Sequence, residues 1–251
     1  MKPILLILLP LTTLFLIYGV VVFWKMSQQL GAVPNGNRLA RFESSPQFDS
    51  KTGRFQNEFP PEGGEPNPPF FTMLKLFLFG HEIRIPRSPL PTITPDLQAF
   101  LDTSGANSQE TRVIWLGHST LLLNMSGRII LIDPTLSKRV APVHFLGNRF
   151  QPPPLTLEQI PELDFIVLSH DHYDHLDRSS VRFLKKRLKP GARIITALGV
   201  GARLESFGIE PDMITELDWW EKYETGNEAG NLSFTATPAQ HFSGRSFNDR
   251  Q

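Results

Sequence analysis

The sequence has 251 residues, of which 40% are apolar, and this is enough to bury a core. The 25 Lys and Arg residues balance the 25 Asp and Glu residues, so the net charge is +0. Proteins that bind a nucleic-acid backbone usually carry a basic excess, so no nucleic-acid partner is expected. Cysteine is absent, which excludes disulfides and thiolate ligands, and a metal site would have to use His and carboxylate side chains.

The N-terminal segment is apolar. Residues 4–24 contain no charge over 21 positions, and a helix of that length spans about 30 Å, the thickness of a bilayer core. A cleavable signal peptide usually has an apolar region of about 7–15 residues and then small residues at the cleavage site. Here Trp24, Lys25 and Met26 end the run. Residues 1–28 are therefore predicted to form a single-pass membrane anchor; a signal peptide and a buried core helix are the alternatives.

Residues 29–110 are expected to form an extension with little regular structure. Prolines recur from residue 34 to residue 95, and proline disfavours helix interiors and central strands. The exception is the segment 70–80, FFTMLKLFLFG, which is apolar apart from Lys75. We expect it to pack against the following domain, with a position at the membrane surface as the alternative.

The pattern changes at about residue 111, and residues 111–251 are predicted to form a layered α/β domain. Asp177 is expected to cap a helix over residues 178–188, which ends before Pro190 and Gly191. A turn is expected at residues 125–128. The predicted strands are 113–116, 121–123, 129–132, 165–168, 193–196 and 232–237, and the second predicted helix is 200–207.

The most informative segment is SHDHYDHLD at residues 169–177, which follows a predicted strand and opens a predicted helix. His170 and His172 are two residues apart, so in an extended chain both rings lie on the same side. Asp174 and His175 then point toward a neighbouring position as the chain enters the helix. Imidazole and carboxylate ligands together suit zinc. The segment therefore predicts a metal site, and a solvated loop is the alternative.

This H-x-H-x-D-H motif resembles the signature of the metallo-β-lactamase superfamily of hydrolases. The resemblance implies an αββα sandwich and two zinc ions, the first bound by His170 and His172 and the second by Asp174 and His175. His241 lies in the segment PAQH that follows the last predicted strand, and it resembles the element that completes the first site. A surface loop histidine is the alternative for His241.

Further motifs narrow the resemblance to the branch of N-acylphosphatidylethanolamine-hydrolysing phospholipases D and their bacterial, membrane-associated relatives. These motifs are WLGHST at 115–120, LIDP at 131–134, RFQPPP at 149–154, ELDWW at 216–220 and QHFS at 240–243. The branch implies that a hydroxide bridging the two metals attacks a membrane phospholipid diester, releasing phosphatidic acid and an N-acylethanolamine. Asp174 is then the predicted catalytic residue as well as a ligand.

Two other functions stay open. One is a lactonase-type hydrolase of a small soluble substrate, and the other is a truncated, non-catalytic, membrane-tethered metal-binding module. The superfamily also uses a metal-bridging aspartate and a final histidine in the second half of its fold, and neither follows His241 in this sequence. We therefore expect only the first half of the sandwich here and assign hydrolysis to the complete protein, with this stretch alone inactive.

Four residues outside the main motif have less specific signals. His118 follows a predicted strand, and a structural role is favoured over a place in the cleft. Asp133 resembles the superfamily aspartate that steadies the metal loop, with an ordinary turn as the alternative. Trp219 and Trp220 are expected in the core, with an acyl groove as the alternative.

Overall fold

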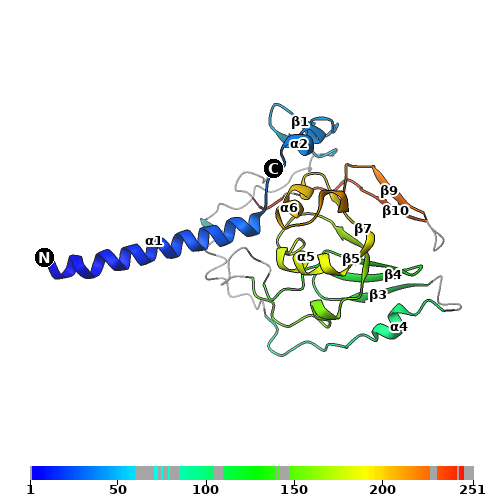
Figure 1. Ribbon diagram of the computed structural model, residues 1–251, viewed down its shortest axis with the longest axis horizontal. Helices are drawn as coiled ribbons and strands as arrows, with labels where there is room; N and C mark the ends of the chain where they lie inside the picture. Colours follow the sequence, from blue (N-terminus) through cyan, green and yellow to red (C-terminus); the bar gives the residue numbers. More distant parts are fainter. Residues whose placement is uncertain are drawn as a thin grey trace.

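The computed structural model describes residues 2–59, 71–72, 75, 79, 85–104, 110–139, 141, 147–226, 231–241 and 243–245. At its centre lies a six-stranded mixed sheet, which confirms the α/β prediction. In spatial order its strands are β3 (Thr111–Trp115), β4 (Leu121–Met125), β5 (Arg128–Ile132), β6 (Leu163–Leu168), β7 (Leu188–Ala197) and β8 (Ile214–Leu217) (Figure 1). Five of the six predicted strands lie in this sheet, and the sixth, predicted over residues 232–237, lies in a separate two-stranded sheet. β8 is a strand of the central sheet that was not predicted.

The direction of the strands changes within the sheet. β3, β4 and β5 are antiparallel, whereas β5, β6, β7 and β8 are parallel. β4 and β5 are joined by Ser126 and Gly127, whose φ angles of 50° and 76° suit a two-residue hairpin. β6 is joined to β7 through α5 (Arg178–Leu184), and β7 is joined to β8 through α6 (Val200–Ser206). Because the carboxyl ends of parallel strands meet at one edge, the loops after β5 and β6 lie side by side there.

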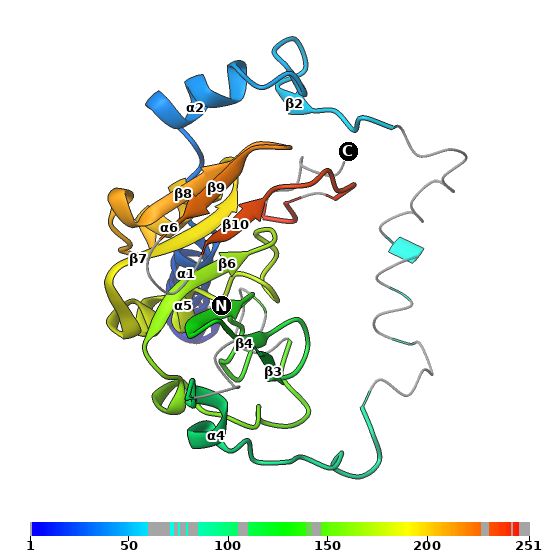
Figure 2. The ribbon, with the colours of Figure 1, turned by 90° about the vertical axis from the view of Figure 1, so that its right-hand side faces the viewer.

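The core is divided between the two faces of the sheet, because neighbouring strand residues point to opposite sides. Ile166 and Ile194 pack on the face covered by α5 and α6. Phe165 and Ile195 pack on the other face, which the hairpin of β9 (Lys222–Thr225) and β10 (Leu232–Thr235) covers through Phe234 (Figure 2). The central sheet thus has a helix layer on one face and the β9–β10 hairpin on the other, so the four-layer αββα sandwich and the expectation that only its first half is present stay predictions.

The helix predicted over residues 178–188 is shorter than expected. α5 ends at Leu184, a 3-10 turn, η3 (Lys185–Arg187), follows, and Leu188 already pairs with Leu163 as the first residue of β7. The reason is tertiary. Residues from Leu188 onward pair with β6 in the sheet, so they cannot continue the helix that the apolar spacing predicted. The predicted cap is confirmed, because the Asp177 carboxylate accepts a hydrogen bond of 3.0 Å from Ser179 N.

The predicted apolar N-terminal helix is present as α1 (Lys2–Leu30). Its segment Pro10–Leu30 is long and apolar enough to cross a membrane, with a mean hydropathy of 1.4, and none of it is buried in the protein. In Figure 1, α1 projects from the sheet domain, and only its carboxyl end lies against that domain. Length and composition fit an anchor and a signal sequence alike.

The extension contains more regular structure than its prolines predicted. α2 (Gly36–Glu43) precedes a short pairing of β1 (Phe48–Asp49) with β2 (Arg54–Phe55), and α4 (Leu97–Leu101) precedes the sheet. Arg38 ties α2 to the domain, because its guanidinium binds the carboxylates of Glu205, at 2.7 Å, and Glu216. Most of the apolar segment 70–80 lies outside the described residues. Its packing and the boundaries at residues 28 and 110 stay predictions.

Candidate metal centre

The residues of the candidate site gather at the carboxyl edge of the parallel strands. The loop after β6 carries the motif HDHYDH, and it curls back on itself, because Leu176 N donates a hydrogen bond of 2.8 Å to His172 O. Asp177 then caps α5, so the loop is held at both ends by regular structure. A loop fixed in this way between a strand and a helix positions side chains reproducibly.

Three histidine side chains converge in the first cluster. His170 Nε2 lies 2.9 Å from His172 Nδ1, and His241 Nε2 lies 3.0 Å from His170 Nε2 and 2.9 Å from His172 Nδ1. His241 comes from the segment after β10, about 70 residues further along the chain. The structure therefore brings together the three residues that were predicted to form the first metal position.

This arrangement fits a shared cation better than a hydrogen-bonded cluster. One ring N–H can donate to only one neighbour at a time, so three nitrogens in mutual contact leave lone pairs facing one another. A tetrahedral zinc with bonds of about 2.0–2.1 Å holds its nitrogen ligands roughly 3.3 Å apart, close to the separations here. The three imidazoles therefore fit a zinc-type ion.

The second cluster contains Asp174, His175 and a residue that the sequence did not favour. His118 Nε2 lies 2.9 Å from Asp174 Oδ2, and the ring centroids of His118 and His175 are 5.5 Å apart. The side chain of His118 is half exposed and lies against the metal loop, so its structural role and its alternative place in the cleft both stay predictions. Gly117 was the available signal for a turn here, and Gly117 and His118 have φ angles of 95° and 49°.

The electrostatics keep these side chains in the protonation states that metals bind. Burial, and then the neighbouring histidines, lower the pKa of His170 to about 3, and burial also lowers that of His172. Burial alone would raise the pKa of Asp174. Hydrogen bonding to the backbone and the neighbouring histidines outweigh the effect of burial, so the pKa of Asp174 is lowered. At neutral pH His170 and His172 are therefore neutral imidazoles, and Asp174 is a carboxylate. The assignment of His170, His172, Asp174, His175 and His241 as ligands stays a prediction.

Asp133 holds the metal loop from the end of β5, the role that its motif suggested. Its carboxylate accepts hydrogen bonds from Ser169 N, at 2.8 Å, and Ser169 Oγ, at 2.7 Å, and it lies 2.8 Å from His175 Nδ1. Because Nδ1 of His175 faces Asp133, Nε2 is the ring nitrogen left for the cluster. A carboxylate partner of this kind fixes the orientation of a ligating imidazole.

A buried carboxylate on the opposite side of the loop was missed by the sequence analysis. Asp171 accepts hydrogen bonds from Arg203 Nε, at 2.6 Å, and from Ser243 Oγ, at 2.7 Å. The guanidinium of Arg245 binds the carbonyl oxygens of Asp171 and Leu176. Burial lowers the pKa of Arg245 to about 10, although Asp171 opposes this shift. The sequence did contain a signal for this contact. In an extended chain neighbouring side chains point to opposite sides, so Asp171 points away from the rings of His170 and His172.

Two further residues bear on the site. Gly244 has a φ of +70°, and a Cβ there would lie 2.3 Å from His172 Cδ2, so only glycine allows the backbone to approach this ring. The expectation that Trp219 and Trp220 belong to the core is wrong for Trp220, which is 61% exposed. It adopts a left-handed conformation, with a φ of 68°, and its N–H donates to Ala236 O, a contact that turns the chain at the end of the sheet.

Replacing His170 and His172 together by Ala should remove most of the bound zinc, because two of three converging nitrogens disappear. The measurement is the metal content of purified protein by elemental analysis. The control is Asp212→Asn, which changes an exposed carboxylate on η4 (Pro211–Met213). Unchanged metal content in the double variant would show that these histidines are not ligands.

Replacing Asp171 by Ala should lower the free energy of unfolding by about 3–5 kcal/mol, because it removes the carboxylate that faces two buried guanidinium groups. Chemical denaturation in detergent and with a chelator present measures this effect apart from metal binding. Asp212→Ala serves as the exposed control. A stability equal to that of the parent protein would mean that the buried charges are compensated elsewhere.

Comparisons with known proteins agree with this geometry. Residues 128–251 match the family model described as the Beta-lactamase superfamily domain. An uncharacterized protein of Mycobacterium tuberculosis is 38% identical over 166 residues, which are 66% of this chain and 41% of that protein. N-acyl-phosphatidylethanolamine-hydrolyzing phospholipase D 1 of Caenorhabditis elegans is 37% identical over 139 residues, 54% of this chain and 39% of that one.

A UPF0173 metal-dependent hydrolase of Anaeromyxobacter is 32% identical over 136 residues, 54% of this chain and 44% of that one. The chain thus spans about two fifths of the length of these curated relatives. Residues 128–251, which match the family model, include the loop after β6 and the segment that carries His241. Residues 128–251 thus match the metallo-β-lactamase superfamily domain, and the chain shows distant homology to N-acyl-phosphatidylethanolamine-hydrolyzing phospholipases D and to UPF0173 metal-dependent hydrolases.

Proposed function

We propose that the complete protein is a membrane-anchored, zinc-dependent hydrolase of a phosphodiester bond in N-acylphosphatidylethanolamine-like phospholipids. The observation that carries the proposal is the meeting of His170, His172 and His241, next to a second cluster of His118, Asp174 and His175. The similarity to the Caenorhabditis elegans phospholipase D supports the choice of substrate.

The roles of the residues follow from their contacts. His170, His172 and His241 would hold one ion, and Asp174 and His175 the second. When bound, such ions supply Lewis-acid chemistry: they polarise a phosphoryl oxygen and make water nucleophilic near neutral pH. Asp174 stays ionised, because its pKa is lowered, and it is therefore available as a ligand.

Two more residues of the chain orient the site. Asp133 holds Nδ1 of His175, and His118 holds one carboxylate oxygen of Asp174, so both second-position residues are fixed before a substrate arrives. Preorganised groups of this kind lower the cost of reaching the transition state. The half exposure of His118 and the exposure of His241 leave the site open to a phosphodiester from outside.

The membrane location is also a proposal, and α1 supports it. Large apolar side chains from Leu11 to Trp24 are exposed on every side of this helix, a pattern that suits lipid rather than a protein core. Anchoring keeps the catalytic domain within reach of lipid headgroups and so raises the effective concentration of a membrane substrate. An uncleaved anchor is proposed over a signal sequence, because Lys25, Gln28 and the end of the helix form part of the folded domain surface.

The substrate is tested with the complete, zinc-loaded protein and N-acylphosphatidylethanolamine in detergent micelles. We expect release of the N-acylethanolamine, and a loss in the Asp174→Asn variant that exceeds the roughly 10–100-fold effect of changing outer-shell residues. Asp212→Asn should retain parental activity. Hydrolysis of a sugar lactone with no turnover of any phosphodiester would establish the soluble-substrate alternative. Zinc binding without hydrolysis of either compound would establish the non-catalytic module.

The anchor is tested by washing membranes with carbonate at high pH. Burial of about twenty apolar residues does not depend on charge, so the parent protein should stay in the membrane fraction. Leu14→Lys combined with Ile17→Lys should move it to the supernatant, whereas Lys51→Gln should not. A mature N-terminus that begins after Trp24 would instead identify a signal sequence.

A further inference from the structure

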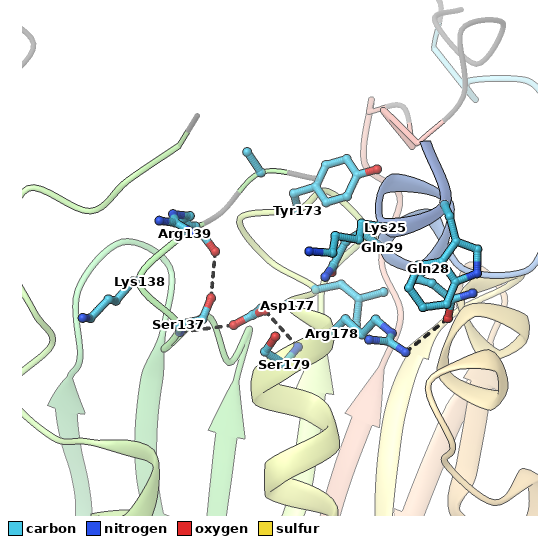
Figure 3. Close-up of a pocket in the computed structure, with 13 residues that line it drawn as sticks. Lys25, Gln28, Gln29, Ser137, Lys138, Arg139, Tyr173, Asp177, Arg178 and Ser179 are labelled. Atoms are coloured by element: carbon cyan, nitrogen blue, oxygen red, sulfur yellow. Dashed lines mark hydrogen bonds between the residues drawn. The ribbon is translucent and has the colours of Figure 1, made fainter. Parts of the chain in front are cut away.

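A cavity lies between the end of α1 and the metal loop, outside the histidine clusters. Its volume is about 390 Å³, and it is lined by α1 between Trp24 and Gln29, by residues 137–139 and 141 after β5, and by the chain from Tyr173 to Ser179 (Figure 3). Figure 3 shows Lys25 and Gln29 on one side and Arg139 on the other, with Tyr173 above them and Asp177 to Ser179 below. The cavity is therefore bounded both by α1 and by the loop that carries the candidate ligands.

The lining is strongly basic. It includes Lys25, Arg139 and Arg178, with Lys138 at its outer edge, and within the described part of the chain no ion pair joins any of these four to a carboxylate. Arg178 instead donates a hydrogen bond of 3.4 Å to Gln28, and Arg139 donates one of 2.8 Å to Asn148. These neutral partners leave the charges uncompensated.

The one acidic residue of the lining does not neutralise them. The carboxylate of Asp177 is buried and accepts hydrogen bonds from Ser137 N, at 3.2 Å, Ser179 N, at 3.0 Å, and the Ser180 hydroxyl. Burial and the neighbouring Arg182 lower the pKa of Arg178, as expected where positive charges crowd together. The cavity is therefore suited to an anion.

Its position along α1 indicates where the anion comes from. The uncharged run of α1 ends at Trp24, and Lys25 is the first charged residue after it. Tryptophan and lysine at such a boundary lie at the level of the lipid headgroups. With α1 anchored as proposed above, the cavity opens at that level.

The size of the cavity distinguishes the possible anions. A volume of about 390 Å³ corresponds to roughly a dozen waters at about 30 Å³ each, more than one inorganic phosphate needs. Trp24 and the buried Leu176 add apolar surface next to the cations. This combination matches a phosphate group joined to glycerol and the first carbons of an acyl chain.

We propose that this cavity binds the phosphate-bearing headgroup of an anionic phospholipid, at a site separate from the histidine clusters. The inference rests on the proposed membrane anchor, but not on hydrolysis. A lipid held here contacts α1 and the chain from Tyr173 to Ser179 together. It thereby fixes the catalytic domain against the membrane surface.

The test is calorimetric titration of the full chain, in an uncharged detergent with a chelator, with dihexanoyl phosphatidylglycerol. The chelator removes any metal, so the histidine clusters contribute no phosphate binding. We expect saturable binding that weakens at least tenfold in the Lys25→Gln, Arg139→Gln double variant. The control is Lys51→Gln with Lys222→Gln, two exposed lysines with the same total change in charge, and it should bind as the parent does.

The comparison ligands separate the sources of phosphate. Inorganic phosphate that binds as tightly as the lipid would overturn the assignment to a lipid, and dihexanoyl phosphatidylcholine that does so would overturn the preference for an anionic headgroup. Absence of saturable binding, or equal weakening in the control variant, would overturn the site itself. Loss of lipid hydrolysis in the separate activity assay leaves this result untouched, so the two proposals fail independently.

Discussion

The contact between Asp171 and two arginines is the constraint on which the site depends. Asp171, Arg203 and Arg245 are all buried, and burying ionised groups is costly unless each is paired and hydrogen-bonded. The guanidinium of Arg203 binds the Asp171 carboxylate and Leu30 O, and that of Arg245 binds Gln29 O and two carbonyls of the metal loop. The end of α1, α6 and the metal loop therefore hold one another in place.

This arrangement gives the metal loop two functional sides. His170 and His172 face the cluster completed by His241, whereas Asp171, between them, faces the buried arginines. The cations also lie at the carboxyl end of α1, where its free carbonyl oxygens need donors and where positive charge is favourable. Three consecutive residues thus have two functions. His170 and His172 belong to the candidate metal site, and Asp171 holds the arginines that cap α1.

The same geometry relates α1 to the proposed reaction. α1 ends beside the metal loop rather than on a distant face of the sheet, so the cavity at Lys25 and the histidine clusters share the chain from Tyr173 to Ser179. An anchor that ended elsewhere would tether the domain without orienting it. With α1 anchored as proposed, the position of the helix end would set which edge of the sheet faces the lipid.

The sequence by itself determined the local features: the apolar helix, the strands, the Asp177 cap and the grouping of His170, His172, Asp174 and His175 in one loop. Their spacing lies within a few residues, where backbone periodicity decides which side chains share a side. Tertiary structure alone decided that His118 lies beside Asp174, that α5 stops at Leu184 and that Asp171 meets Arg203 and Arg245. The meeting of His241 with His170 was expected only from resemblance, because contacts across tens of residues depend on strand order and chain closure, which no local spacing encodes.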